Sequence, residues 1–300
     1  MFLAGLLCPF GSPLFAQLSD WSVGGRFQFL GTHVSSDGQE LLVHRARLWA
    51  DGRLHPKLSV RFQYGFRPRR LFDLFVNYDP KPNLELRLGI NYLPFIGDFT
   101  EAPFFLDTID FPAGRLLFPA REVGAFVSGT KGQLAYNVSV VRGSGFRGDE
   151  NSWKDVCGFV RFPALTRRLT FGLAHYEGRA GPNGSLVPKR RSATDMVGEA
   201  HDRLTLKAAY VRGLDGRIST DAAWFRAVVH AAKSVDIVGE YDTVVSGPRR
   251  RKWFDLGVNY KLRLPYSDLK FHYRRFQQPR KADEIKVQLQ LFFFYPWRWT

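Results

Sequence analysis

The chain has 300 residues, of which 45% are hydrophobic and 15% aromatic, and this composition excludes an intrinsically disordered protein. Lys and Arg number 43 against 28 Asp and Glu, and the net charge of +15 favours an anionic partner. Most basic residues stand singly within the strand pattern, so we expect no nucleic-acid partner. The two cysteines, Cys8 and Cys157, give no disulfide framework and no metal-ligand spacing, and we expect no metal and no cofactor.

The first sixteen residues, MFLAGLLCPFGSPLFA, form an apolar run that ends in a small residue before Gln17. This pattern predicts a signal peptide over residues 1–16, atypical because no Lys or Arg precedes the run. Residues 17–300 are then one domain. The sequence contains no stretch of 18 apolar residues, so it predicts no transmembrane helix.

From Trp21 onward, apolar and polar residues alternate with a period of two, and no segment has a convincing helical period. The alternation predicts sixteen β-strands. In chain order they are 21–30, 41–53, 58–66, 71–78, 84–92, 122–129, 133–141, 154–162, 168–177, 195–200, 203–212, 222–230, 235–244, 252–262, 268–276 and 283–294.

The connections between these strands alternate between tight turns, such as LHPK, TKG and AAKS, and mostly longer loops, such as GRAGPNGSLVPKRRSAT. Tight turns at one end and long loops at the other are typical of outer-membrane barrels, as is an even strand number. We therefore predict an all-β fold, a transmembrane antiparallel β-barrel of about 16 strands in the bacterial outer membrane. A soluble β-sandwich would give the same alternation.

The two faces of the predicted strands differ in character. In the last strand Ile285, Val287, Leu289, Leu291 and Phe293 form one apolar stripe, which is typical of a lipid-facing band. The opposite faces would line the lumen, where a surplus of basic residues favours anions. The clear acidic residues on these lumen-facing positions are Asp73, Glu85, Glu240 and Asp242. The basic residues on the lumen-facing positions are Arg45, Arg47, Arg61, Arg87, Arg161, Lys207, Arg226, Lys270, Arg274 and Lys286.

One connection, residues 93–121, is nearly thirty residues of Phe, Pro and Gly without periodicity. A loop of this length within a compact domain is uncommon and usually functional. Elsewhere, the sequence from Gly143 to Gly148 matches G-x-G-x-x-G, but no amphipathic helix follows it. A dinucleotide site is therefore not predicted there, and we interpret the segment as an external loop.

Three segments resemble the phosphate-selective porins of the O/P family: HRARLWADGRL at 44–54, ELRLGINYLPFIGDFTE at 85–101 and PAREVGAFVSG at 119–129. The most specific element is Gly89 with Pro94 and Phe95. The resemblance implies a homotrimer of sixteen-stranded barrels whose third external loop folds inward and narrows the pore. Residues 93–121 would be this loop, with Pro94, Phe95, Phe104, Phe105, Phe111, Leu116 and Phe118 in its apolar part and Arg115 and Arg121 facing anions. The best-known members carry a lysine at the constriction, and this loop has none.

These observations predict a channel for passive diffusion of small inorganic anions, with phosphate or polyphosphate as candidates, and outer-membrane lipid and lipopolysaccharide as surroundings. We expect no enzymatic activity. An outer-membrane barrel enzyme or a non-conducting structural barrel is the alternative, and a secreted β-sandwich that binds acidic glycans is a more distant one.

Overall fold

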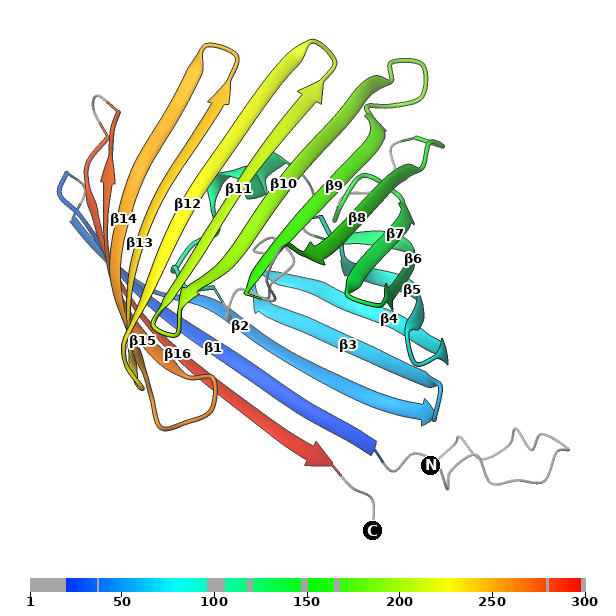
Figure 1. Ribbon diagram of the computed structural model, residues 1–300, viewed down its shortest axis with the longest axis horizontal. Coiled ribbons are helices and arrows are strands. Elements are labelled where there is room, and N and C mark those ends of the chain that lie inside the picture. Colours follow the sequence, from blue (N-terminus) through cyan, green and yellow to red (C-terminus); the bar gives the residue numbers. More distant parts are fainter. Residues whose placement is uncertain are drawn as a thin grey trace, which may run out of the picture.

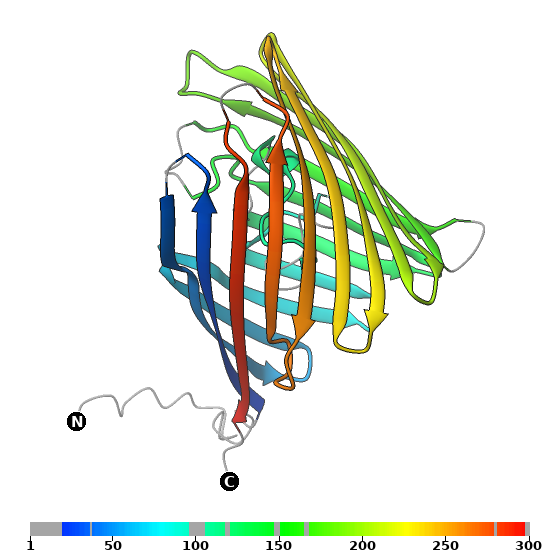
Figure 2. The same cartoon turned by 90° about the vertical axis from the view of Figure 1, so that its left-hand side faces the viewer.

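The barrel closes through its first and last strands. The computed structural model describes residues 20–36, 38–95, 106–117, 121–146, 151–164, 168–278 and 281–297. Within them sixteen antiparallel strands form one closed ring, in which β1 (Asp20–Val34) pairs with β16 (Glu284–Trp297) (Figures 1 and 2). The predicted all-β barrel is confirmed. The predicted signal peptide, residues 1–16, lies outside the described residues.

Each strand from β2 to β15 pairs with the strand before it and the strand after it in the chain. Among the described residues, no helix is long and apolar enough to cross a membrane. A short 3₁₀ helix, η2 (Ala113–Leu117), lies inside the ring, against β11 to β13 (Figure 1). The strands are β2 (Gly38–His55), β3 (Leu58–Arg67), β4 (Arg69–Lys81), β5 (Leu84–Tyr92), β6 (Arg121–Lys131), β7 (Leu134–Val141), β8 (Asp155–Pro163), β9 (Leu169–Ala180), β10 (Val187–His201), β11 (Leu204–Asp215), β12 (Ile218–Ala232), β13 (Val235–Ser246), β14 (Arg249–Lys261) and β15 (Asp268–Phe276).

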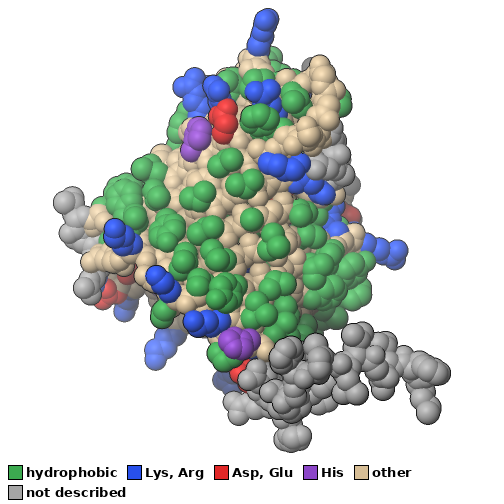
Figure 3. All heavy atoms as spheres, turned by 90° about the vertical axis from the view of Figure 1, so that its right-hand side faces the viewer, with side chains coloured by type: hydrophobic (Ala, Val, Ile, Leu, Met, Phe, Trp, Pro, Cys, Tyr) green, Lys and Arg blue, Asp and Glu red, His purple; other side chains and the backbone are tan. Residues whose placement is uncertain are grey.

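The outer face of the barrel is apolar around its middle. On β14, Phe254, Leu256 and Val258 are 42–49% exposed, whereas Asp255 and Asn259, which have the opposite facing in the period of two, are buried on the lumen side. Figure 3 shows one side of this belt, with hydrophobic side chains over the middle and Lys and Arg mainly toward the two ends. A closed ring leaves no unpaired strand edge in lipid, so belt and closure together make this a barrel of the bacterial outer membrane.

Part of the lumen wall is lined with small residues. Ala174, Ala193, Ala209 and Ala222 are buried on the inner faces of β9 to β12. The start of the 93–121 connection packs into the same apolar cluster, where the Phe95 side chain is fully buried. A wall of alanines leaves room for a second layer inside the barrel, and the long loop fills that room.

Candidate constriction site

The loop that follows β5 carries two acidic residues into the lumen, and the first is Asp107. Its carboxylate lies 2.9 Å from Lys207 Nζ on β11 and 3.1 Å from an Arg226 guanidinium nitrogen on β12. Arg226 also donates to Thr108 Oγ1 at 3.2 Å and pairs with Glu240 on β13. Burial alone would raise the pKa of Asp107, but Lys207 and Arg226 outweigh it and hold the pKa below its ordinary value.

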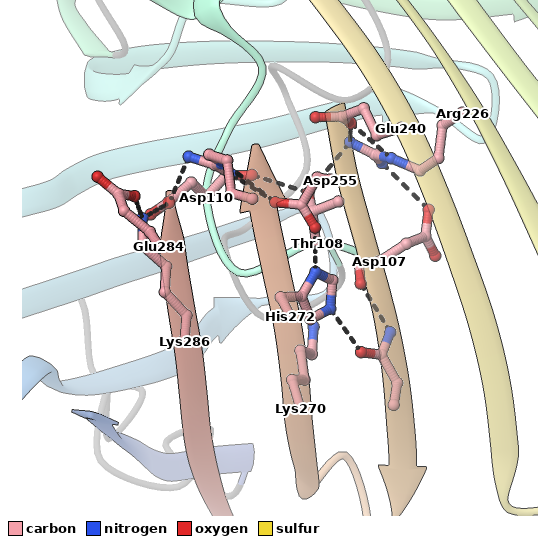
Figure 4. A network of polar contacts seen from close by, with 12 residues as sticks. Asp107, Thr108, Asp110, Arg226, Glu240, Asp255, Lys270, His272, Glu284 and Lys286 are labelled. Atoms are coloured by element: carbon pink, nitrogen blue, oxygen red, sulfur yellow. Dashed lines mark hydrogen bonds and ion pairs between the residues drawn. The ribbon is translucent and has the colours of Figure 1, made fainter. Parts of the chain in front are cut away.

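The second acid, Asp110, joins the last two strands. Its carboxylate accepts from Lys286 at 2.7 Å and from Arg274 at 3.0 Å. Arg274 also pairs with Asp255 at 2.8 Å, and Lys286 with Glu284 at 2.9 Å. Burial opposes the charged form of Asp110, yet Lys286 and Arg274 keep its pKa well below the ordinary range. Figure 4 shows the contacts between the loop and β12 to β16. We call Asp107 and Asp110, together with their partners Lys207, Arg226, Arg274 and Lys286, the acidic anchor.

The same wall also binds the backbone of the loop. Lys270 donates to the carbonyl of Leu106, and Asn259 donates to the next carbonyl along the chain at 2.6 Å. The backbone N–H of Ala113 donates to Asp242 at 2.7 Å. The described loop segment 106–117 is thus held by buried hydrogen bonds from several strands, and its position in the lumen is fixed by the wall.

Four residues predicted to bind anions therefore hold the loop. Each faces the lumen, and each has a carboxylate within 4 Å. Their positive charges are largely balanced locally, so they contribute less to the field in the lumen than their number suggests. They are Lys207, Arg226, Lys270 and Arg274.

The other side of the lumen holds a second group of basic residues, on β1, β2 and β6. Arg121 donates to Asp73 at 2.6 Å and to Gln63 at 3.0 Å, and its guanidinium carbon lies 3.6 Å from the centre of the Tyr92 ring. In the period of two, Tyr92 has the same facing as Leu86 and Leu88, whose side chains are exposed on the outer face. The structure places it instead against a buried arginine, because β5 ends at this residue and the chain turns into the loop.

Arg47 interacts electrostatically with Arg121, and Arg26 interacts electrostatically with Arg47. The guanidinium of Arg47 stacks over the Phe72 ring at 3.8 Å, and that of Arg121 lies 4.7 Å from the same ring. Arg45, two residues from Arg47, donates to Gln28 at 2.9 Å. Amides and aromatic faces neutralise no charge. Asp73 pairs with Arg121, and the nearby Asp110 and Asp268 also pair with other basic residues, Arg274 and Lys270, so this side of the lumen keeps a net positive charge.

Arg115 adds a charge from the loop itself. It sits in η2, 5.5 Å from the ring of Phe111, and interacts electrostatically with Tyr92 and Arg121. Burial lowers the pKa of Arg115 to about 10, so the group is charged at neutral pH. We call Arg26, Arg45, Arg47, Arg115 and Arg121 the arginine cluster.

The remaining predicted site residues lie apart from this cluster or outside the described residues. Phe104 and Phe105 fall in the undescribed part of the loop, as does Phe118. Pro94 accepts a hydrogen bond from the buried Cys157 thiol at 3.3 Å. Three predicted arginines face the lumen paired with a strand carboxylate: Arg61 with Asp51 at 3.1 Å, Arg87 with Glu85 at 2.9 Å and Arg161 with Asp195 at 2.7 Å.

Sequence reasoning missed several members of the site. Arg26 and Gln28 alternate with Phe27 and Phe29, so the period of two contained the signal for Arg26 as a lumen residue. Loop residues Leu106 and Ile109, 2% and 0% exposed, are buried, although the prediction relied on phenylalanines. Nothing local marks Asp107 and Asp110, because their partners lie more than 95 positions further along the chain.

The glycine-rich segment after β7 has a structural role in its described part. The backbone N–H groups of Gly143 and Gly145 donate to the Glu122 carboxylate at 3.1 and 2.8 Å. Gly143 has a φ of 88°, which suits glycine. The N–H groups that a nucleotide phosphate would need are thus occupied by a side chain of the protein.

No protein-family model matches the sequence, and the curated proteins include no match. Solved structures do match. The anion-selective porin from Comamonas acidovorans has a TM-score of 0.69 at 11% identity, covering 92% of this chain and 100% of that one. A loop-deleted OmpT, an outer membrane protein of Vibrio cholerae, has a TM-score of 0.67 at 12% identity, covering 91% and 99%. OccK11 of Pseudomonas aeruginosa has a TM-score of 0.56 at 11% identity, covering 93% and 96%.

Identities this low show the fold alone, and the fold is a porin-type outer-membrane barrel, an architecture that suits a channel for small solutes. The likeness supports porins in general rather than the phosphate-selective family in particular. It also corrects one prediction. We expected no enzymatic activity, but the matches include OmpT, which is described as an outer membrane protein and not as a porin. The prediction that the protein has no enzymatic activity was wrong, because the barrel fold that it shares with these proteins does not exclude catalysis.

Proposed function

We propose that the protein is an outer-membrane channel for the passive diffusion of small anions. The observation that carries the proposal is the unequal charge of the two sides of the lumen. The acidic anchor balances the basic residues of β11 to β16 with loop and wall carboxylates. In the arginine cluster, Arg121 pairs with Asp73 at 2.6 Å. An anion that passes the loop therefore meets net positive charge in a confined space, where screening is weak.

The finer parts of the proposal concern the solute and the oligomeric state. Phosphate and polyphosphate are favoured as solutes by the resemblance to phosphate-selective porins and by the geometry of clustered guanidinium groups, which suits phosphate oxygens. A homotrimer is favoured by the same resemblance. One of the solved OmpT structures that the chain resembles is a trimer form.

The decisive experiment is a reversal-potential measurement in planar bilayers. Purified protein is inserted into a neutral bilayer, and the zero-current potential is recorded under a tenfold potassium chloride gradient. We expect a potential that reports chloride permeating faster than potassium. A cation-selective potential would refute the proposal, and an absence of conductance in refolded protein would favour the structural or enzymatic barrel instead.

A further inference from the structure

A separate cavity lies above the constriction, between the loop helix η2 and the external ends of β12 to β14. Its volume is about 510 Å³, within the range of small-molecule sites. The turn from β13 to β14 is at the end of the barrel opposite the two termini, so the cavity lies on the external side. Arg115 belongs both to this cavity and to the arginine cluster, so a solute that enters from outside would reach the cavity before the other members of the cluster.

The described residues that line this cavity combine four arginines with apolar side chains and include no carboxylate. The apolar part consists of Phe111, Leu117, Val244 and Trp253. The basic part consists of Arg115, Arg249, Arg251 and Arg274. Such a lining differs from that of a purely electrostatic site, which has no use for apolar surface.

Two of the arginines are available to a ligand. Arg249 and Arg251 follow the period of β14 that puts Trp253 and Asp255 on the lumen side, and both are exposed. Neither forms a salt bridge with the described part of the chain. Arg274 is bound to Asp255 and Asp110, and it lies 5.6 Å from the ring of Trp253. The free positive charge is thus at the rim, and the apolar surface lies deeper.

From this arrangement we infer that the cavity is a binding site for organic anions with an aromatic ring, in particular monocyclic aromatic carboxylates. The carboxylate would accept hydrogen bonds from Arg249 and Arg251, whose forked geometry suits it. The ring would lie against Phe111, Leu117 and Trp253. The inference rests on the proposed function and narrows its solute class.

The size and chemistry of the cavity favour this ligand over inorganic phosphate. A cavity of about 150 Å³ is enough for benzene, so 510 Å³ holds a ring, a carboxylate and some water. Phosphate is hydrated on every side and gains nothing from Phe111 or Val244. An aromatic carboxylate gains from both parts of the lining, because its ring leaves water while its charge stays at the rim.

The test measures binding directly in the refolded full chain. Equilibrium dialysis with radiolabelled benzoate, acetate and phosphate gives three dissociation constants in detergent, and no conductance is required. We expect benzoate to bind about tenfold more tightly than acetate, and Arg251→Ala or Arg249→Ala to weaken benzoate binding about tenfold through loss of a charge-assisted contact. Trp253→Phe should keep most of the affinity and Trp253→Ala should lose it for benzoate while leaving acetate unchanged.

The matched control is Arg250→Ala, which removes the same charge from the outward face of the same strand. We expect it to leave benzoate binding unchanged. Equal affinities for benzoate and acetate, or an equal effect of Arg250→Ala and Arg251→Ala, would overturn the inference. The reversal potential of the same preparation separates the two proposals. An anion-selective channel that shows no preference for benzoate would refute the binding site alone. A cation-selective channel would refute the proposed function, whatever the dialysis gives.

Discussion

Arg26 on β1 and Arg47 on β2 face each other directly across the strand pair, both with side chains buried in the lumen. Like charges opposite each other destabilise a sheet. The pair persists beside further arginines, so the local structure carries positive charge at some cost in stability. Such a cost in stability is expected where the positive charge contributes to permeation.

The first prediction concerns Arg47→Ala. A unit charge about 8 Å from an ion in water changes its energy by roughly 0.5 kcal/mol. Because Arg47→Ala removes this attraction for anions and the equal repulsion of cations, the anion-to-cation permeability ratio should fall about sixfold. Stability should change by less than about 1 kcal/mol, because relief of the repulsion offsets the lost stacking on Phe72. Reversal potentials and urea unfolding in vesicles measure the two effects. Arg53→Ala, at the exposed periplasmic end of the same strand, is the control, and a shift as large as that of Arg47→Ala would argue against the cluster.

The second prediction concerns the acidic anchor. Asp110→Asn removes the shared partner of Arg274 and Lys286 and should destabilise the loop attachment by about 1–3 kcal/mol. The loss of one negative charge beside Arg274 and Lys286, which keep Asp255 and Glu284 as partners, should raise the anion-to-cation permeability ratio. The looser loop should increase open-channel current noise. Asp202→Asn, which removes an exposed partner of Arg168 in a periplasmic turn, should change neither. A fall in anion preference in Asp110→Asn would contradict the assigned role.

The third prediction is a pH dependence. The pKa values of Asp107 and Asp110 are held below their ordinary 3.8 by the basic partners. A carboxyl group with a lowered pKa contributes its full attachment energy above the ordinary value and loses it as the pH falls through the lowered value. Current noise should therefore be the same at about pH 7 and pH 5 and rise only below about pH 3. The Asp110→Asn channel should be noisier than the native one already at neutral pH, and a native transition near pH 6 would contradict the anchor.

The fourth prediction tests the outer face. Leu256 is 49% exposed near the middle of β14, and Leu256→Arg should cost about 2–4 kcal/mol if the site lies at the bilayer midplane. Thr130→Arg, at the exposed periplasmic end of β6, should cost less than about 0.5 kcal/mol. Unfolding free energies in lipid vesicles give both values. Equal tolerance of the two arginines would mean that the apolar belt does not face lipid.

The strands were predictable because lipid and lumen impose a strict period of two. The bounds of β5 and β15 agree with the prediction, whereas β10 begins at Val187 rather than at residue 195. The missed part, VPKRRSAT, has charged residues on both faces: Arg190 pairs outward with Glu177, and Arg191 pairs with Asp215. Beyond the membrane neither face needs to be apolar, so the periodic signal disappears while the strand continues.

The site was less predictable, because the loop has no period that relates it to the wall. The period of two predicted that Arg226 and Arg274 face the lumen. It could not predict that carboxylates of the loop pair with them. Arg115 and Arg249 line one cavity although 134 positions separate them in the chain. Pairing of this kind is decided by the shape of the closed ring, which no local pattern encodes.

The acidic anchor also orders events during assembly. Asp110 takes its partners from β15 and β16, and 176 positions separate it from Lys286. The loop emerges early in synthesis, and Asp107 can pair with β11 and β12, but Asp110 cannot acquire both of its partners until the final strand has arrived. A barrel that has not yet added β16 lacks the Lys286 contact, and one without β15 also lacks the Arg274 contact. The narrowing of the pore is thereby coupled to completion of the wall, and an unfinished barrel would be recognisable by its unfastened loop.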